Sequence, residues 1–258
     1  MDGETTRQRY ESVCQRIADA KARAGRTNET VHLVAVTKYA AMDQVRELIE
    51  LGHVDFGESR LQHFLKIAPQ VDEYLQRRRS LGEGDVPEAA RWHFIGHLQR
   101  NKVRKLLPLV RLVHSVDSLR LAEEIQSCGE DSDSPTEVLV QINPTDNRNQ
   151  HGIAPAAVKH LIEQIETMIT IRVRGLMAMA PKTDDPEEAR IVFERVREIF
   201  LEIQRSGAGG ERFDILSMGM SNDFEVAVEC GANIVRVGTA IFGDTEVAEA
   251  TAPEQAGA

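Results

Sequence analysis

The stretch Val31-His32-Leu33-Val34-Ala35-Val36-Thr37-Lys38 decides how the chain folds. It is apolar and β-branched, it has no helical period, and it leaves no room for a helix before Met42. It therefore predicts a strand buried on both faces, as in a parallel sheet. The lysine at its end is unusual, because lysine is among the residues least often fully buried. Lys38 either extends to water or occupies a pocket that uses its amine, and the stretch alone leaves both readings open.

Further buried strands alternate with segments of helical period along the rest of the chain. We expect strands over residues 31–37, 53–57, 91–96, 110–115, 137–143, 171–179, 213–218 and 233–238. We expect helices over residues 4–24, 42–51, 61–78, 118–128, 155–168, 185–204 and 222–230, with a basic helix that ends near residue 107. This α/β alternation predicts a single closed (β/α)8 barrel of the TIM type with an extra N-terminal helix.

An open doubly wound sheet is the competing fold. It would need a glycine-rich turn after the first strand, and Lys38-Tyr39-Ala40-Ala41-Met42 is nothing like one. We therefore expect the barrel to span residues 1–243. Residues 244–258 lose all hydrophobic pattern and are expected to be a disordered tail.

Composition narrows the classes of function. The chain has 258 residues and a net charge of −10, which argues against nucleic-acid binding. No apolar run is long enough to span a membrane and no secretory signal is present, so we expect a cytoplasmic protein without membrane contact. Its three cysteines are far apart, and His93 and His97 lie on a strand and its following loop. Neither pattern predicts a metal site.

Glycines and hydroxyls gather after the last two expected strands. The chain reads SMGMSND over residues 217–223 after the seventh strand and GTAIFG over residues 238–243 after the eighth. Barrel enzymes often hold phosphate groups at these two loops. Glycine allows a ligand to approach the backbone, and hydroxyls donate to its oxygens. The segments predict either a phosphate site or tight turns capped by serine.

Arg236 shares a strand face with Gly238, and that face points either into the barrel or toward the helices. If it points inward, Arg236 is a buried cation beside the expected phosphate or the ring attached to it. The apolar neighbours Ile234, Val235 and Val237 leave the strand no polar face, which disfavours a surface ion pair.

Several segments, in order along nearly the whole chain, resemble the pyridoxal-phosphate-binding proteins of the YggS/PROSC (pyridoxal phosphate homeostasis protein) family. The matching segments are residues 35–38 (AVTK), 55–58 (DFGE), 92–102 (WHFIGHLQRNK), 114–117 (HSVD), 175–179 (GLMAM), 216–221 (LSMGMS) and 236–243 (RVGTAIFG).

The resemblance implies a barrel like the amino-terminal domain of bacterial alanine racemase. Pyridoxal 5′-phosphate (PLP) would be held as a Schiff base on Lys38, with phosphate contacts from Ser217, Gly238 and Thr239 and with Arg236 near the pyridine nitrogen. The expected cofactor contacts also include Met220 and Ser221 of the matching segment 216–221, and Ser59, which follows the matching segment 55–58.

This sequence departs from the family at two places. Ser59 stands where the family usually has asparagine, which replaces an amide by a shorter hydroxyl. Asn147 and Gln150, in the loop after the fifth strand, stand where glutamate and lysine are common.

Three classes of function fit the resemblance. The leading one is a non-catalytic carrier that buffers PLP, with amino acids as further small-molecule ligands and PLP-dependent apoenzymes as candidate recipients. Arginine at the ring nitrogen would make the cofactor a poor electron sink, which suits a carrier.

The second class is an amino-acid racemase, which needs acid/base groups on both faces of the substrate carbon. We expect no second domain after Gly243 to supply one of these groups. The third is an aldolase-like lyase that uses Lys38 directly on a sugar phosphate. We expect a monomer or weak dimer.

Overall fold

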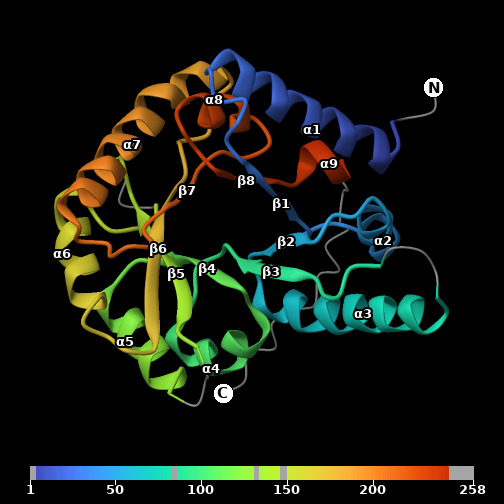
Figure 1. The fold of residues 1–258 in the computed structure, drawn as a ribbon, viewed down its shortest axis with the longest axis horizontal. Helices are drawn as coiled ribbons and strands as arrows, with labels where there is room; N and C mark the ends of the chain where they lie inside the picture. Colours follow the sequence, from blue (N-terminus) through green and yellow to red (C-terminus); the bar gives the residue numbers. More distant parts are fainter. Residues whose placement is uncertain (1–3, 83–85, 131–133, 146–149, 244–258) are drawn as a thin grey trace, which may run out of the picture.

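A closed barrel of parallel strands forms the centre of the molecule, as the sequence predicted (Figure 1). The computed structural model describes residues 4–82, 86–130, 134–145 and 150–243. Each strand pairs with the next in the chain, and β8 closes on β1. The strands are β1 (His32–Val36), β2 (Asp55–Glu58), β3 (Arg91–Phe94), β4 (Leu112–Val116), β5 (Thr136–Ile142), β6 (Ile171–Ala178), β7 (Ile215–Ser217) and β8 (Ile234–Val237).

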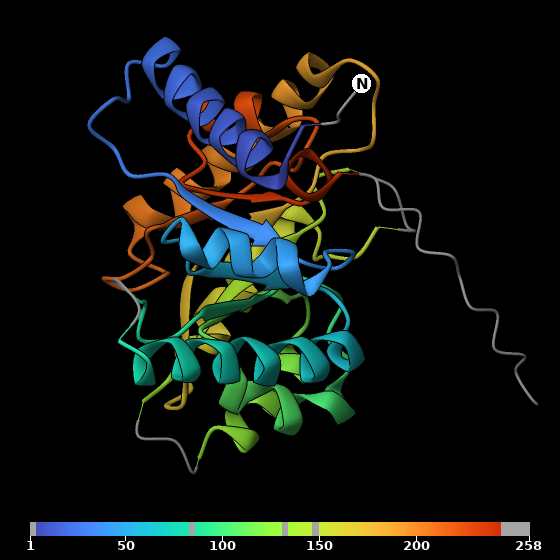
Figure 2. The same ribbon diagram turned by 90° about the vertical axis from the view of Figure 1, so that its right-hand side faces the viewer.

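Helices surround the strands and cover their outer faces. They are α1 (Thr6–Arg23), α2 (Met42–Glu50), α3 (Leu61–Ser80), α4 (Val103–Leu106), α5 (Leu119–Cys128), α6 (Pro155–Ile165), α7 (Ala189–Ser206), α8 (Phe224–Glu229) and α9 (Thr239–Phe242). The expected extra helix is α1, which lies beside the C-terminal elements α8 and α9 (Figure 2). Arg16 pairs there with Glu225 at 2.6 Å.

Two apolar layers stabilise the barrel. The inner layer is made by side chains that point into the barrel: Val34, Leu112, Leu139, Met177 and Ile234. A larger outer layer packs the strands against the helices and includes Phe56, Phe94, Phe193 and Phe224. Ile234 belongs to the inner layer and side chains alternate along a strand, so Arg236 also points inward. The structure thus decides between the two faces that the sequence left open.

Some predicted boundaries differ from the structure. The basic segment after β3 is not one helix but a 3₁₀ turn (η1, Arg100–Lys102), α4 and a second 3₁₀ turn (η2, Leu107–Leu109). Pro108 lies in the second turn, and proline cannot donate the backbone hydrogen bond that a continuing α-helix needs. The loop after β8 contains the unpredicted helical turn α9. The expected tail, residues 244–258, lies outside the described residues.

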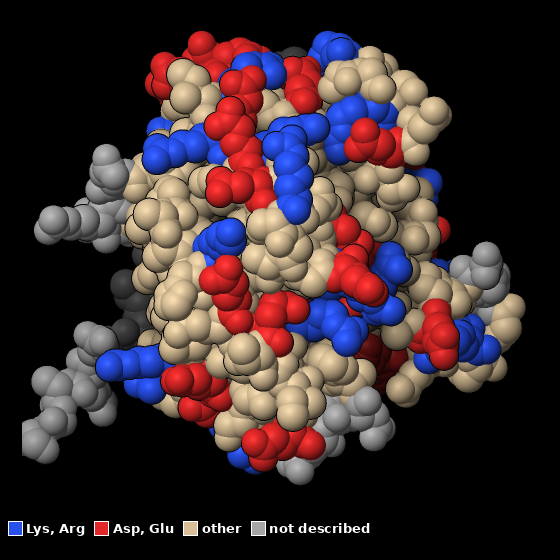
Figure 3. Space-filling model, turned by 60° about the vertical axis from the view of Figure 1, so that its left-hand side comes forward, with Lys and Arg blue, Asp and Glu red and all other residues tan. Residues whose placement is uncertain are grey.

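The outer surface carries charges of both signs. On the face drawn in Figure 3, acidic and basic side chains are interspersed and form no continuous field of one sign. Ion pairs join neighbouring elements in the same way, as where Arg190 of α7 contacts Glu229 of α8 at 2.6 Å. Within the described residues, no helix has the length and apolar character that crossing a membrane requires.

Gly175 in β6 allows a close approach of β7, and this generates a prediction. Its φ is +149°, and a Cβ atom there would lie 1.8 Å from the backbone oxygen of Ile215. We expect Gly175→Ala to lower the free energy of unfolding by about 2–4 kcal/mol, because the strands must separate to make room. Urea unfolding monitored by circular dichroism measures this loss.

The matched control is Gly207→Ala at the end of α7. Gly207 also has a positive φ of +72°, but nothing lies within 4 Å of its added Cβ. Gly207→Ala should lower the free energy of unfolding by only about 1 kcal/mol, which is the penalty for an alanine in the left-handed backbone conformation. Equal losses in the two variants would contradict a role for close strand packing at Gly175.

Candidate functional site

A cavity of about 380 Å³ opens at the carboxyl ends of β1, β6, β7 and β8. Parallel barrels place their ligand sites at this end, and the volume suits a small organic ligand. Its lining residues are Val36, Lys38, Tyr39, Ala40, Ile95, Met179, Ala180, Pro181, Lys182, Thr183, Pro186, Met220, Ser221, Asn222, Asp223, Arg236, Gly238, Thr239, Phe242 and Gly243.

Two cations reach this cavity from adjacent strands. Val34 of β1 lies directly opposite Arg236 of β8, and Lys38 follows Val34 and Val36 at alternate positions just beyond the strand. Lys38 is half-buried, and its Nζ lies 4.6 Å from the centre of the Tyr39 ring. Arg236 is only 3% exposed. The pair therefore combines an accessible amine with a fixed guanidinium deeper in the barrel.

Hydrogen bonds fix the guanidinium of Arg236. One terminal nitrogen donates to Ser217 Oγ at 2.6 Å, and the other donates to the backbone oxygen of Ala178 at 2.9 Å. Burial lowers the pKa of Arg236 to about 10, partly offset by the nearby carboxylate of Asp223. The side chain therefore keeps its positive charge at neutral pH.

A column of polar side chains continues from Arg236 through the inside of the barrel. Ser217 Oγ lies 3.0 Å from His114 Nδ1, and His114 Nε2 lies 3.0 Å from His93 Nδ1. His93 Nε2 lies 3.2 Å from Asp55 Oδ1. Asp55 in turn accepts two hydrogen bonds from Arg91, at 2.8 and 2.6 Å. We call this series of hydrogen-bonded side chains, from Arg236 to Asp55, the polar column.

The shifted pKa values of Asp55 and His114 indicate the charge that each of these two groups carries in the polar column. Burial raises the pKa of Asp55, but hydrogen bonds from His93 and Arg91 outweigh this and lower it to about 2, so Asp55 is a carboxylate. Burial lowers the pKa of His114 well below its usual value, helped by His93 and Arg236, so His114 is neutral. Arg236 donates to Ser217 at one end of the column, and at the other end His93 Nε2 donates to the Asp55 carboxylate, which can only accept.

The loops after β7 and β8 are joined at the cavity wall. The Ser221 hydroxyl oxygen accepts from the backbone N–H groups of Gly238 and Ala240, at 3.2 and 3.3 Å. The Asp223 carboxylate accepts from the Met220 N–H at 2.6 Å. Burial raises the pKa of Asp223, although this hydrogen bond opposes the shift. These contacts hold residues 220–223 in a turn, and the following helix α8 begins at Phe224 rather than at the predicted Asn222.

Comparison with known proteins identifies the family. Residues 10–246 match the family model described as "Alanine racemase, N-terminal domain". The pyridoxal phosphate homeostasis protein of Aquifex aeolicus is 37% identical over 237 residues, which cover 92% of this chain and 97% of that protein. The corresponding Pseudomonas aeruginosa protein is 36% identical, and the match covers 90% of this chain and 92% of that protein. The chain belongs to the pyridoxal phosphate homeostasis protein family.

Solved structures agree with this family assignment. PipY of Synechococcus elongatus with PLP bound is 32% identical, with a TM-score of 0.68, and the match covers 88% of this chain and all of that one. The crystal structure of an unknown protein from Bifidobacterium adolescentis has a TM-score of 0.83 at 34% identity, and the match covers 94% of this chain and 97% of that one. An alanine racemase of Clostridium difficile, 15% identical with a TM-score of 0.64, shares the fold; the match covers 90% of this chain and 56% of that one.

The residues expected to contact a cofactor fall into two groups. Those that line the cavity are Lys38, Met220, Ser221, Arg236, Gly238 and Thr239. Ser217 is fully buried behind Arg236, and Ser59 lines a separate cavity with His63, His97 and Lys102. Gln150, one of the departures from the family pattern, donates to the backbone oxygen of Met179 at 2.8 Å and so ties its loop to β6. Asn147 lies outside the described residues.

Sequence reasoning missed the middle of the polar column. His93 and His114 each stand between apolar residues of a buried strand, and this was the available signal, since a buried polar group needs a hydrogen-bonding partner. It also missed Tyr39 and Lys182 as cavity residues. These follow the strand ends in loops, where the residue pattern does not reveal which side chains turn inward.

The depressed pKa of Asp55 predicts an acid-dependent loss of stability. The pKa of Asp55 is about 2 in the folded protein and about 3.9 in the unfolded chain. The carboxylate therefore contributes fully to folding stability above about pH 3.9, and this contribution is lost as the pH falls toward 2. We expect Asp55→Asn to lower the free energy of unfolding by about 2 kcal/mol at pH 7. Between pH 4 and 2, the free energy of unfolding of this variant should change less with pH than that of the unaltered protein. Urea unfolding across this range measures both effects.

Asp43→Asn is the control, because Asp43 is a carboxylate whose side chain is 90% exposed on α2. Its profile should follow that of the unaltered protein. If Asp55→Asn keeps the full acid dependence, Asp55 does not carry the charge at the foot of the polar column.

Proposed function

We propose that this chain binds PLP in the cavity at the carboxyl end of the barrel and acts as a carrier in PLP homeostasis. Lys38 would be the attachment point through a Schiff base, Arg236 would face the pyridine nitrogen, and the loop after β8 would hold the phosphate. The observation that carries the proposal is that Lys38 and the buried Arg236 open onto one cavity. The structure of PipY with PLP bound supports the choice of ligand.

The residues present suit each part of PLP. The cofactor supplies an aldehyde that reacts reversibly with amines, and the half-buried Lys38 is an amine on the cavity wall. A phosphate needs donors, and Thr239 offers a hydroxyl beside the backbone N–H groups that Ser221 now engages. The apolar side chains of Val36, Ile95 and Phe242 would exclude water from the ring.

Arg236 favours a carrier over a catalyst. Its guanidinium can only donate hydrogen bonds, and it remains charged at neutral pH. A ring nitrogen facing it would accept a hydrogen bond and stay unprotonated, which weakens the pull of the ring on electrons. Ser217 and Ala178 hold the guanidinium from behind, so it cannot easily turn away. The proposed activity is therefore binding and release of the cofactor without turnover.

The assignment of Lys38 as the attachment point can be tested directly. Borohydride reduction of the PLP-loaded protein, followed by peptide mass mapping, should place the pyridoxyl group on Lys38. Lys38→Ala should lose the adduct and the visible absorbance of bound PLP, since no amine remains at that position.

Lys182→Ala is the matched control, because Lys182 lines the same cavity. It should keep both the adduct and the absorbance, and an adduct on Lys182 would refute the role given to Lys38. Sustained conversion of an L-amino acid to its D-isomer by the loaded protein would favour the racemase reading instead.

Removing a phosphate contact and removing a ring contact should have different effects on the affinities for PLP and for unphosphorylated pyridoxal. Thr239→Val deletes a donor to a dianion, which costs about 1.5–3 kcal/mol, so PLP affinity should fall by roughly one to two orders of magnitude. Unphosphorylated pyridoxal should bind this variant as well as it binds the unaltered protein. Arg236→Gln should weaken both ligands, because the ring contact is common to them. Equilibrium titrations with PLP and with pyridoxal measure the difference.

Thr239→Ser keeps the hydroxyl and should bind PLP almost normally. If Thr239→Val weakens pyridoxal as much as PLP, the loop after β8 does not hold the phosphate and the proposed orientation is wrong.

A further inference from the structure

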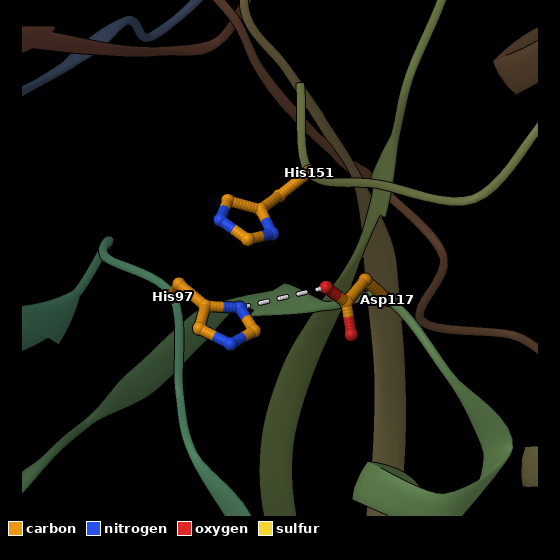
Figure 4. A group of neighbouring side chains, drawn as sticks. All are labelled: His97, Asp117 and His151. Carbon is orange, nitrogen blue, oxygen red and sulfur yellow. Dashed lines mark ion pairs between the residues drawn. The ribbon is translucent and has the colours of Figure 1, made fainter. Parts of the chain in front are cut away.

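His97, Asp117 and His151 meet at the carboxyl ends of β3, β4 and β5, away from the Lys38 cavity. None of the three lines that cavity. Their ligand atoms all lie within 4.8 Å of one another. Figure 4 shows the two imidazoles and the carboxylate facing one another, with His97 Nδ1 and Asp117 Oδ2 3.7 Å apart. We propose that these side chains bind a divalent transition-metal cation of the zinc type.

The barrel brings these residues together from distant parts of the sequence. His97 follows β3 and Asp117 directly follows β4. His151 lies in the loop after β5, and this loop folds back on its own strand. Gln141 of β5 donates its side-chain amide to the His151 backbone oxygen at 3.0 Å, and Ile153 N–H donates to the Gln141 backbone oxygen at 2.9 Å. The backbone of His151 is therefore fixed at the rim of the barrel.

The three donor groups suit a shared cation. The His97 and His151 rings stack with centres 4.1 Å apart and an angle of 12° between their planes, so the rings must turn for one nitrogen of each to point at the same ion. A metal ion uses neutral imidazoles, and the Asp117 carboxylate compensates part of its charge. Within the described part of the chain, no lysine or arginine pairs with Asp117.

The donor set indicates the class of metal. Two imidazoles and one carboxylate suit zinc, cobalt or nickel, whereas calcium and magnesium prefer oxygen ligands alone. Bonds of about 2.0–2.2 Å require the three ligand atoms to close together by roughly 1–2 Å. The side chain of His97 is 45% exposed and His151 is also exposed, so their rings can turn without disturbing the core. Three protein ligands leave positions open for water or for a bound molecule.

Titration of the full-length protein with metal tests the proposal. After dialysis against a chelator, Zn²⁺ should bind with one-to-one stoichiometry in calorimetry, and Co²⁺ should change its visible spectrum on binding. His97→Ala, His151→Ala and Asp117→Asn should each weaken Zn²⁺ binding by about tenfold or more, since losing even an outer-shell partner typically costs that much. The matched control is His160→Ala, an exposed histidine on α6, which should bind Zn²⁺ normally.

Two results would overturn the site: no stoichiometric Zn²⁺ binding by the unaltered protein, or binding that His97→Ala and His151→Ala leave unchanged. Unfolding midpoints of the variants verify that they remain folded. PLP binding by the same variants should be normal, so failure of the metal site and failure of the proposed carrier function remain distinguishable.

Discussion

The burial of Arg236 is the constraint on which the rest of the barrel interior depends. A guanidinium removed from water loses a large hydration energy, and it is stable only where hydrogen bonds or charges replace the lost water. Ser217 and the backbone of Ala178 supply the hydrogen bonds directly. The carboxylate of Asp55 closes the far end of the polar column that begins at Arg236. The positive charge at the cavity is therefore linked to a carboxylate at the opposite, amino-terminal end of the barrel.

This arrangement changes how the inside of the barrel is packed. Barrels of this class usually fill their interior with layers of branched apolar side chains. Here the apolar inner layer shares the space with His93, His114 and Ser217, each buried in a strand. A histidine ring carries a nitrogen on each side, so the two histidines in series each contact a polar neighbour at both ring nitrogens. A leucine at either position would leave its neighbours without partners.

The rim of the barrel carries two groups of different chemistry. The side formed by β1 and β6–β8 presents Lys38, Arg236 and hydroxyls, which suit an aldehyde and a phosphate. The side formed by β3–β5 presents two imidazoles and a carboxylate, which suit a cation. Parallel strands end together at one rim, so short loops can place both groups on the same face without altering the core that supports them.

The sequence by itself determined the fold and the two cations of the site. Short, mainly apolar runs predicted all eight strands, because burial on both faces favours apolar residues in them. Lys38 and Arg236 were recognisable because each is a charge on an apolar strand. Only the tertiary structure decided which face Arg236 takes, that Ser217 lies behind it, and that His93, His114 and Asp55 complete the polar column. Closure of the barrel also decided that His97, Asp117 and His151 meet. The physical reason is that such contacts depend on strand register and on the path of loops, which the periodicity of one strand does not encode.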